Sequence, residues 1–430
     1  MTKRNDRFAS VLKMNRRSFT LGVGATILAA PATIRYARAA APLKIGCMAP
    51  LTGFFAREGQ NCQRGFDLAG PMLADMGMPV ELMMADTESN PDKARTAAEK
   101  LIGDGAQVLI GTFVSGETAA VAQVAEQKGI PHVINVAAAP QITEQGYKYV
   151  FRNFPTGPML VINGFTLMKE LFAATGVTPK TAVFMHVNDT FGTSMQKGVE
   201  ALAPKLDLPF QIVETIAYDA KAKDLSVEVA KAKATGADIM MPVSHGADAI
   251  MLVREMVKQR WSPMGVMTPG SPGTYDAQFI KTLGKYSEFI TANVPWVDPS
   301  TAMSKELIGR FNKMFSDDQL ELNAGYSFEA VLIAADAYKR ANSGDGAAIA
   351  EALRTTNITE HVMVGGPIQF NEKGQNVNHK SPALQNINHR HTVLLPQGAA
   401  EPDPAFPVPV WSVAQPAWRD DLGRGARRHP

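Results

Sequence analysis

The chain has 430 residues, of which 45% are hydrophobic and 20% are charged. It is therefore long and apolar enough for two or three folded domains, and its bulk is not intrinsically disordered. The 43 Lys and Arg side chains against 41 Asp and Glu give a formal charge of +2, which argues against a nucleic-acid-binding protein. With two cysteines, the chain alone can form neither a disulfide scaffold nor a four-cysteine zinc site.

The first 39 residues differ from the rest in charge, because they hold eight Lys and Arg side chains and one acid, which leaves the remainder at about −5. The basic segment is followed by a short apolar stretch, 21–30, and by Ala37-Arg-Ala39, which is typical of a secretory signal. The pair Arg16-Arg17 resembles the twin-arginine export signal. We predict that residues 1–39 are a twin-arginine-type signal peptide, that cleavage follows Ala39, and that the mature protein is periplasmic without a membrane span. An uncleaved signal anchor is the alternative.

After residue 42, short apolar runs alternate with segments of helical periodicity. Strands are expected at 43–49, 80–85, 107–111, 131–135, 181–187, 210–215, 238–243 and 266–268. Helices are expected at 59–76, 91–102, 117–128, 192–203, 225–235 and 247–259. This alternation is typical of parallel strands covered on both faces, and its restart near residue 181 predicts two doubly wound α/β lobes. Residues 396–430, rich in Pro, Gly and Arg, are predicted to be a loose tail.

The loops that follow the predicted strands are rich in Gly, Ser, Thr and Asn. In open parallel sheets, ligands bind outside the carboxyl ends of the strands. Each of these loops leads into a helix, so backbone N–H groups at several helix N-termini converge on one cleft, which suits an anionic group and commonly a carboxylate. The loops are 50–59, 86–88, 111–116, 135–140, 188–192, 244–246 and 268–273.

Many short strings between about 43 and 395 resemble, in order, the periplasmic branched-chain amino acid (Leu/Ile/Val) type of ABC-transporter substrate-binding protein. They include Pro50-Leu-Thr-Gly53, Asp86-Thr-Glu-Ser-Asn-Pro-Asp-Lys-Ala94, Val108-Leu-Ile-Gly111, Ala234-Thr-Gly-Ala-Asp238 and Gly366-Pro-Ile-Gln-Phe-Asn-Glu-Lys-Gly374. The resemblance implies a type I periplasmic binding fold, in which two lobes joined by three hinge crossovers close on a small molecule. It implies ABC permease subunits as partners and no cofactor. Lobe 1 is expected at 42–157 plus 296–362, and lobe 2 at 158–295 plus 363–395.

The resemblance also implies ligand contacts. Ser115 matches the serine that holds the ligand carboxylate, beside the backbone of Val136 and Ala138. Phe191 matches a position that is often Tyr, and His245 lies near another aromatic contact. Each residue has an alternative role: Ser115 could cap the helix that starts near residue 117, Phe191 could be a hydrophobic plug, and His245 could cap a helix.

Three positions depart from the pattern of amino-acid binders. Ala138 stands where a threonine is usual, Gly270 falls near the acid that pairs with the ligand's ammonium group, and Glu58 occupies an aromatic position. Asp276 is a carboxylate further along from Gly270. The missing hydroxyl and acid weaken the case for an α-amino acid, because buried groups left unpaired in a site reduce affinity by orders of magnitude.

Six aromatic side chains fall in or near the predicted cleft loops, in a chain with 7% aromatic residues. They are Phe54, Phe55, Phe113, Phe191, Trp296 and Tyr326. Rings on both lobes could sandwich a planar ligand, and Arg57 could clamp its carboxylate. We therefore favour an aromatic or planar acid over an aliphatic amino acid. Alternatively, Arg57 is a solvated partner of Glu58, and Trp296 stiffens a crossover.

No catalytic motif appears in the chain: there is no G-x-S-x-G, no P-loop and no H-E-x-x-H. We therefore predict a binding protein and not an enzyme, with a hydrolase as a remote alternative. A sensory module that presents its ligand to a receptor kinase is a further alternative. Pairing of Cys47 with Cys62 is left open, and His389-x-His391 lacks a third ligand for a metal.

Overall fold

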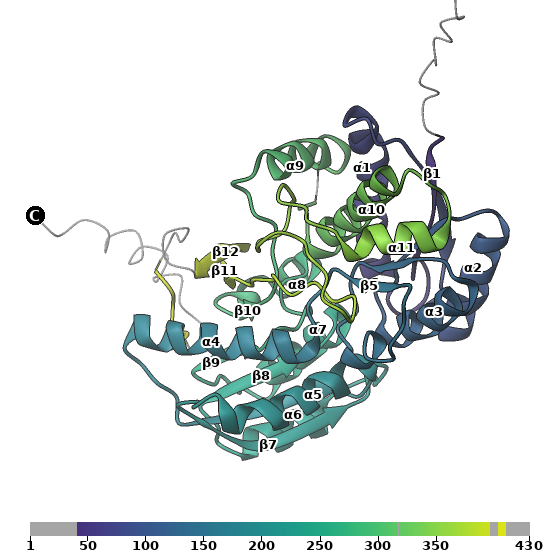
Figure 1. Ribbon diagram of the computed structural model, residues 1–430. Helices are drawn as coiled ribbons and strands as arrows, with labels where there is room; N and C mark the ends of the chain where they lie inside the picture. Colours follow the sequence, from purple (N-terminus) through teal and green to yellow (C-terminus); the bar gives the residue numbers. More distant parts are fainter. Residues whose placement is uncertain (1–40, 317, 396–402, 410–430) are drawn as a thin grey trace, which may run out of the picture. The chain divides into compact units, whose positions relative to one another are not determined.

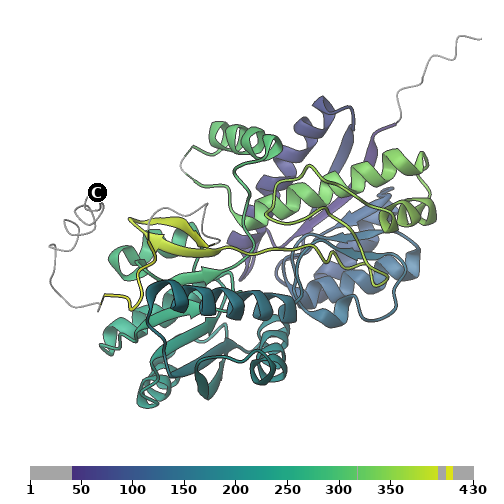
Figure 2. The same cartoon turned by 60° about the vertical axis from the view of Figure 1, so that its left-hand side comes forward.

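The computed structural model describes residues 41–316, 318–395 and 403–409. Two β-sheets with flanking helices form this part of the chain (Figure 1, Figure 2). The predicted signal peptide, residues 1–39, lies outside the described residues. In the described part, no helix is both long and apolar enough to cross a membrane.

The first sheet has five parallel strands in the order β2-β1-β3-β4-β5. They are β1 (Leu43–Ala49), β2 (Val80–Asp86), β3 (Val108–Ile110), β4 (His132–Ile134) and β5 (Val150–Arg152). Its helices are α1 (Ala56–Asp75), α2 (Pro91–Gly103) and α3 (Ser115–Lys128). The chain moves to one side of β1 and then to the other, which makes the carboxyl end of β1 a switch point where ligands bind in such sheets.

The second sheet repeats this order as β7-β6-β8-β9-β10 and continues into two antiparallel strands, β11 and β12. The strands are β6 (Thr181–Val187), β7 (Gln211–Tyr218), β8 (Ile239–Val243), β9 (Gly265–Thr268), β10 (Thr291–Asn293), β11 (Ala383–Ile387) and β12 (Arg390–Leu395). Its helices are α4 (Gly157–Thr175), α5 (Thr190–Leu202), α6 (Ser226–Ala234), α7 (Gly246–Lys258) and α8 (Ala277–Leu283). The predicted fold class, two doubly wound parallel sheets, is confirmed.

Three more helices follow β10: α9 (Ala302–Met314), α10 (Leu322–Ala341) and α11 (Gly346–Arg354). Short 3-10 turns lie at Pro140–Ile142, Ala203–Lys205 and Gly284–Ser287. Helix α10 packs against α1 and therefore belongs with the first sheet (Figure 1). Most of α10 is buried, because other elements of the molecule cover it on nearly every side.

The chain passes between the sheets after β5, after β10 and before β11. The third passage lies later than the predicted boundary at residue 363. Arg152 of β5 donates its backbone N–H to the carbonyl of Gly374 at 2.7 Å and accepts from the N–H of Asn376 at 2.9 Å. These hydrogen bonds hold residues 374–376 at the edge of the first sheet, so placing them in lobe 2 was wrong. The assignment of the other residue ranges to lobes stays a prediction.

One part of the predicted loose tail packs on the second sheet. The side chain of Phe406 is buried, with its ring 5.1 Å from that of Phe172 in α4. The N–H of Val408 donates to the carbonyl of Met264 at 2.8 Å. The prediction of a loose tail was therefore wrong for residues 403–409, because the buried side chain of Phe406 holds them against the second sheet. The rest of the predicted tail lies outside the described residues.

Candidate functional site

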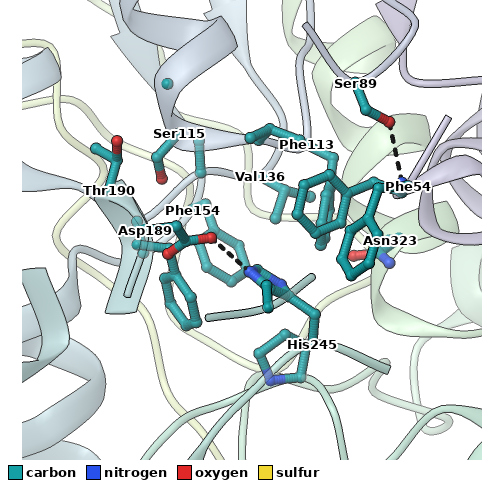
Figure 3. A pocket seen from close by; sticks show the side chains of 18 of the residues that line it. Phe54, Ser89, Phe113, Ser115, Val136, Phe154, Asp189, Thr190, His245 and Asn323 are labelled. Atoms are coloured by element: carbon teal, nitrogen blue, oxygen red, sulfur yellow. Dashed lines mark hydrogen bonds and ion pairs between the residues drawn. The ribbon is translucent and has the colours of Figure 1, made fainter. Parts of the chain in front are cut away.

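A cavity of about 460 Å³ lies where the carboxyl ends of the two sheets face each other (Figure 3). Each of the ten parallel strands supplies at least one lining residue from the loop that follows it. For the first sheet, in chain order, these include Phe55, Ser89, Ser115, Val136 and Phe154. For the second sheet they include Asp189, Lys221, His245, Tyr275 and Pro295. The cavity therefore occupies the position that the doubly wound topology predicts for a ligand.

Eight of the twelve predicted ligand contacts line this cavity. They are Phe54, Phe113, Ser115, Val136, Ala138, Phe191, His245 and Gly270. Arg57, Glu58, Trp296 and Tyr326 do not line it. Phe55, which was singled out for its ring, does.

Aromatic rings from both sheets meet at the cavity. The ring centroid of Phe55 lies 4.9 Å from that of Phe54 and 4.7 Å from the imidazole of His245. Phe191 lies 5.4 Å from His245, and Phe113 lies 5.9 Å from it. The contact of Phe191 is tilted and the other three are edge-to-face, a geometry that stabilises aromatic clusters beyond their buried area. These rings form one aromatic cluster in a wall that also contains small, aliphatic and polar residues.

We did not predict two of the rings that line the cavity, Phe154 and Tyr275, and the two predicted rings Tyr326 and Trp296 lie behind them. Tyr326 is buried 5.0 Å behind Phe154, and Trp296 lies 5.6 Å from Tyr275. Phe154 follows β5, a three-residue strand that we did not predict, and Tyr275 lies two residues beyond the loop that we expected after β9. Trp296 thus packs in the segment after β10, in keeping with its alternative role.

Ser115 lies at the N-terminus of α3 with a side chain that is 3% exposed. Its Oγ has no hydrogen-bond partner among the described residues. The alternative in which Ser115 caps a helix from residue 117 is wrong, because the helix begins at Ser115 itself. The hydroxyl and the first N–H groups of α3 are therefore available donors at the cavity.

The buried His245 and the half-buried Asp189 form an ion pair in the cavity wall. His245 Nε2 lies 2.8 Å from Asp189 Oδ2 (Figure 3). Burial lowers the pKa of His245, but the hydrogen bond and charge of Asp189 outweigh it and raise the pKa to about 9. Burial raises the pKa of Asp189, but the bond from His245 outweighs it, and the pKa is lowered. At neutral pH the cavity therefore contains an imidazolium.

Arg57 and Glu58 make contacts between the sheets, outside the cavity. Arg57 Nε donates to both carboxylate oxygens of Asp276 at 2.8 Å, so neither the predicted ligand clamp nor the alternative pairing with Glu58 is found. Glu58 Oε1 accepts from the first N–H of α7 at 3.3 Å. Glu321 Oε1 accepts from the first N–H of α8 at 2.9 Å. We call these three the interlobe contacts, because each joins α1 or the start of α10 to the second sheet.

Other candidate sites have ordinary structural roles. Cys47 and Cys62 are both buried free thiols. His391 Nδ1 lies 2.8 Å from Asn386 Oδ1, and His389 Nδ1 lies 3.1 Å from Glu288. Within the described residues, no group of three or more His, Cys, Asp or Glu side chains could hold a metal ion.

Comparisons with known proteins agree with this architecture. A family model described as "Periplasmic binding protein" matches residues 42–389. A leucine-, isoleucine-, valine-, threonine- and alanine-binding protein of Pseudomonas aeruginosa is 25% identical over 343 residues, which is 79% of this chain and 88% of that protein. A leucine-binding protein from Thermotoga maritima shares the fold with a TM-score of 0.69 and 20% identity, over 82% of this chain and 97% of that one. A solute-binding protein from R. palustris in complex with benzoate shares it with a TM-score of 0.68 and 19% identity, over 82% and 96%. This chain therefore belongs to the periplasmic binding protein family, a family of solute-binding proteins.

Proposed function

We propose that this protein is the extracytoplasmic solute-binding protein of an ABC importer and that it binds an aromatic or planar carboxylate. The observation that carries the proposal is a cavity lined by six Phe and Tyr rings and by buried donors for an anion. The lining rings are Phe54, Phe55, Phe113, Phe154, Phe191 and Tyr275. They provide faces and edges against which a flat ring can pack.

The donors for the carboxylate come from both sheets. Ser115 and the N-terminus of α3 belong to the first sheet, and the imidazolium of His245 belongs to the second. A helix N-terminus favours an anion through its unpaired N–H groups and its dipole, and hydrogen bonds to a charged acceptor are the strong ones. A carboxylate bound here would therefore gain contacts to both sheets only when they approach each other.

An aliphatic amino acid is the second candidate, favoured by the name of the Pseudomonas relative. Its ammonium group would need an acceptor in the cavity wall. The carboxylates among the described lining residues are Asp189, which is paired with His245, and Asp219, which is exposed. An ammonium group buried without a free carboxylate is costly, so we rank the amino acid second.

Binding follows from lobe closure. In the proposed mechanism the free protein populates open forms, and a ligand that contacts both lobes shifts the population toward the closed form. The interlobe contacts support that form from outside the cavity. A permease would then recognise the continuous surface that the closed lobes present.

A thermal-shift screen of the purified chain tests the proposal, with benzoate, leucine, other amino acids and dicarboxylates as ligands. A ligand at 100 times its Kd stabilises the folded state by about 2.7 kcal/mol, which raises the Tm by a few degrees. We expect the largest shifts from aromatic acids. Shifts confined to leucine-like amino acids would reject the aromatic class, and no shift from any of these ligands would reject the transport of such solutes.

A further inference from the structure

The cavity has a second polar end at Asn323, and Tyr275 is also in its wall, near the carboxyl of Glu321 two residues before Asn323. Asn323 is the second residue of α10, and its side chain is 3% exposed. Figure 3 places Asn323 on the side of the cavity opposite Ser115, with aromatic side chains between the two. Two polar ends separated by rings match a ligand that carries a polar group at each end of a flat body.

Each of these two side chains has one buried polar atom without a hydrogen-bond partner among the described residues. Oδ1 of Asn323 and the hydroxyl of Tyr275 are buried, and neither has a partner among the described residues. About nine in ten buried polar atoms in proteins are hydrogen-bonded, so such atoms on the wall of a binding cavity indicate a group that the ligand supplies. A carboxamide offers an acceptor and donors, and a phenol hydroxyl can both donate and accept.

The charges nearby favour a neutral group at this end. Burial raises the pKa of Tyr275, and the charges of Glu321, Asp276 and Glu58 raise it further, so its hydroxyl keeps its proton. Arg57, the cation beside these carboxylates, is already paired with Asp276. Burial raises the pKa of Glu321 to about 8 and also raises the pKa of Glu58, so neither group supplies a positive charge for a second anion. A hydroxyl would meet one acceptor and one hydroxyl.

We propose that Asn323 selects aromatic acids with a hydroxyl group para to the carboxylate. The carboxylate binds at Ser115, the hydroxyl donates to Oδ1 of Asn323, and the hydroxyl of Tyr275 is its second partner. An ortho hydroxyl lies beside the carboxylate and does not reach Asn323. This inference rests on the proposed function, because it uses the same cavity and the same class of ligand.

Isothermal titration of the full chain with benzoate, 2-hydroxybenzoate and 4-hydroxybenzoate tests it. We expect 4-hydroxybenzoate to bind about 10- to 100-fold more tightly than benzoate, because a site built to hydrogen-bond a hydroxyl rejects the analogue without it. The affinity for 2-hydroxybenzoate should stay within about threefold of that for benzoate. In Asn323→Leu, the ratio of the Kd for benzoate to the Kd for 4-hydroxybenzoate should fall below about threefold. The control Asn357→Leu alters an exposed asparagine outside the cavity and should keep the full advantage.

The outcomes separate this inference from the proposed function. Equal binding of benzoate and 4-hydroxybenzoate to the unaltered chain would overturn the inference and leave the aromatic-acid proposal intact. If 4-hydroxybenzoate still binds more tightly than benzoate to an Asn323→Leu variant that circular dichroism shows to be folded, Asn323 does not recognise the para hydroxyl. If Asn323→Leu does not fold, the comparison of the para and ortho hydroxyls in the unaltered chain decides. Binding of leucine without any aromatic acid would overturn both proposals.

Discussion

Replacing Arg57 with methionine should weaken ligand binding although Arg57 does not line the cavity. Its guanidinium joins α1 to Asp276 at the start of α8, so the contact exists only while the lobes are close together. Methionine keeps an apolar stem and removes the charge. Asp276 also accepts from the N–H of Gln278, and changing Arg57 leaves this helix cap intact.

The size of the effect follows from geometry and exposure. Nε of Arg57 lies 2.8 Å from both oxygens of Asp276, and hydrogen bonds between charged groups contribute about 1.5–3 kcal/mol. The Arg57 side chain is 39% exposed, however, and exposed ion pairs contribute about 0–1 kcal/mol because of solvent screening. Between these limits, we expect the free energy of ligand binding to weaken by about 1–2 kcal/mol, which raises the Kd about 5- to 30-fold.

Arg64 provides a matched control on the same helix. It pairs with Asp318 and covers the ring of Phe315, so its contacts stay among elements that pack on the first sheet. Stopped-flow kinetics with the tightest ligand of the thermal-shift screen should show faster dissociation in Arg57→Met and an unchanged rate in Arg64→Met. An equal effect in both variants, or none in Arg57→Met, would refute the assignment of Arg57 to lobe closure.

Three further predictions concern buried polar groups. Ser115→Ala should weaken binding of the same ligand by about 1–3 kcal/mol in isothermal titration, and unchanged affinity in a folded variant would remove Ser115 from the site. The pKa of His245, about 9, lies above its ordinary 6.5, so its pairing with Asp189 stabilises the fold fully below pH 6.5 and this contribution is lost as the pH rises through about 9. Tm measurements should show this loss in the unaltered chain and not in His245→Gln. Glu329→Gln should lower the free energy of unfolding by about 2–4 kcal/mol in urea titrations, because the buried carboxylate accepts from Asn153 and two backbone N–H groups, and an amide leaves a donor unpaired.

The sequence predicts what depends on local pattern. The strands β1 and β6 are apolar runs of seven residues ended by Pro or by a polar loop, and both lie where expected. The loops after the parallel strands of one sheet meet at one edge, which places Ser115 with Val136. That Phe191 of the second sheet faces them was implied by the family resemblance. The fold class and the loops that supply the cavity wall follow from the pattern, and the facing of the two sheets does not.

Other elements escape pattern analysis for physical reasons. Fifteen of the 20 residues of α10 are buried, so no polar face marks it as a helix, and Asn323 at its start was missed with it. The strand β5 has three residues, which are too few to show an alternation of apolar and polar side chains, and Phe154 after it was missed as well. The partners Arg57 and Asp276 are 219 residues apart, and nothing local in the chain links them. Their pairing depends on how the two sheets approach, which the alternation of strands and helices does not determine.

The positions of the polar groups suggest that affinity and selectivity are set by different residues. The apparent Kd of a protein that must close equals the intrinsic Kd divided by the fraction of molecules competent to bind. Arg57 lies outside the cavity and changes that fraction, so Arg57→Met should raise the Kd of every ligand by the same factor. Asn323 lies inside the cavity, so its replacement should change the ratio of Kd values between ligands that differ in one hydroxyl. Titrating Arg57→Met, Asn323→Leu and the double variant with benzoate and 4-hydroxybenzoate distinguishes the two effects. If they are independent, the changes in binding free energy of the two single variants should add in the double variant for each ligand. A changed ratio in Arg57→Met would mean that the interlobe contacts also shape the cavity.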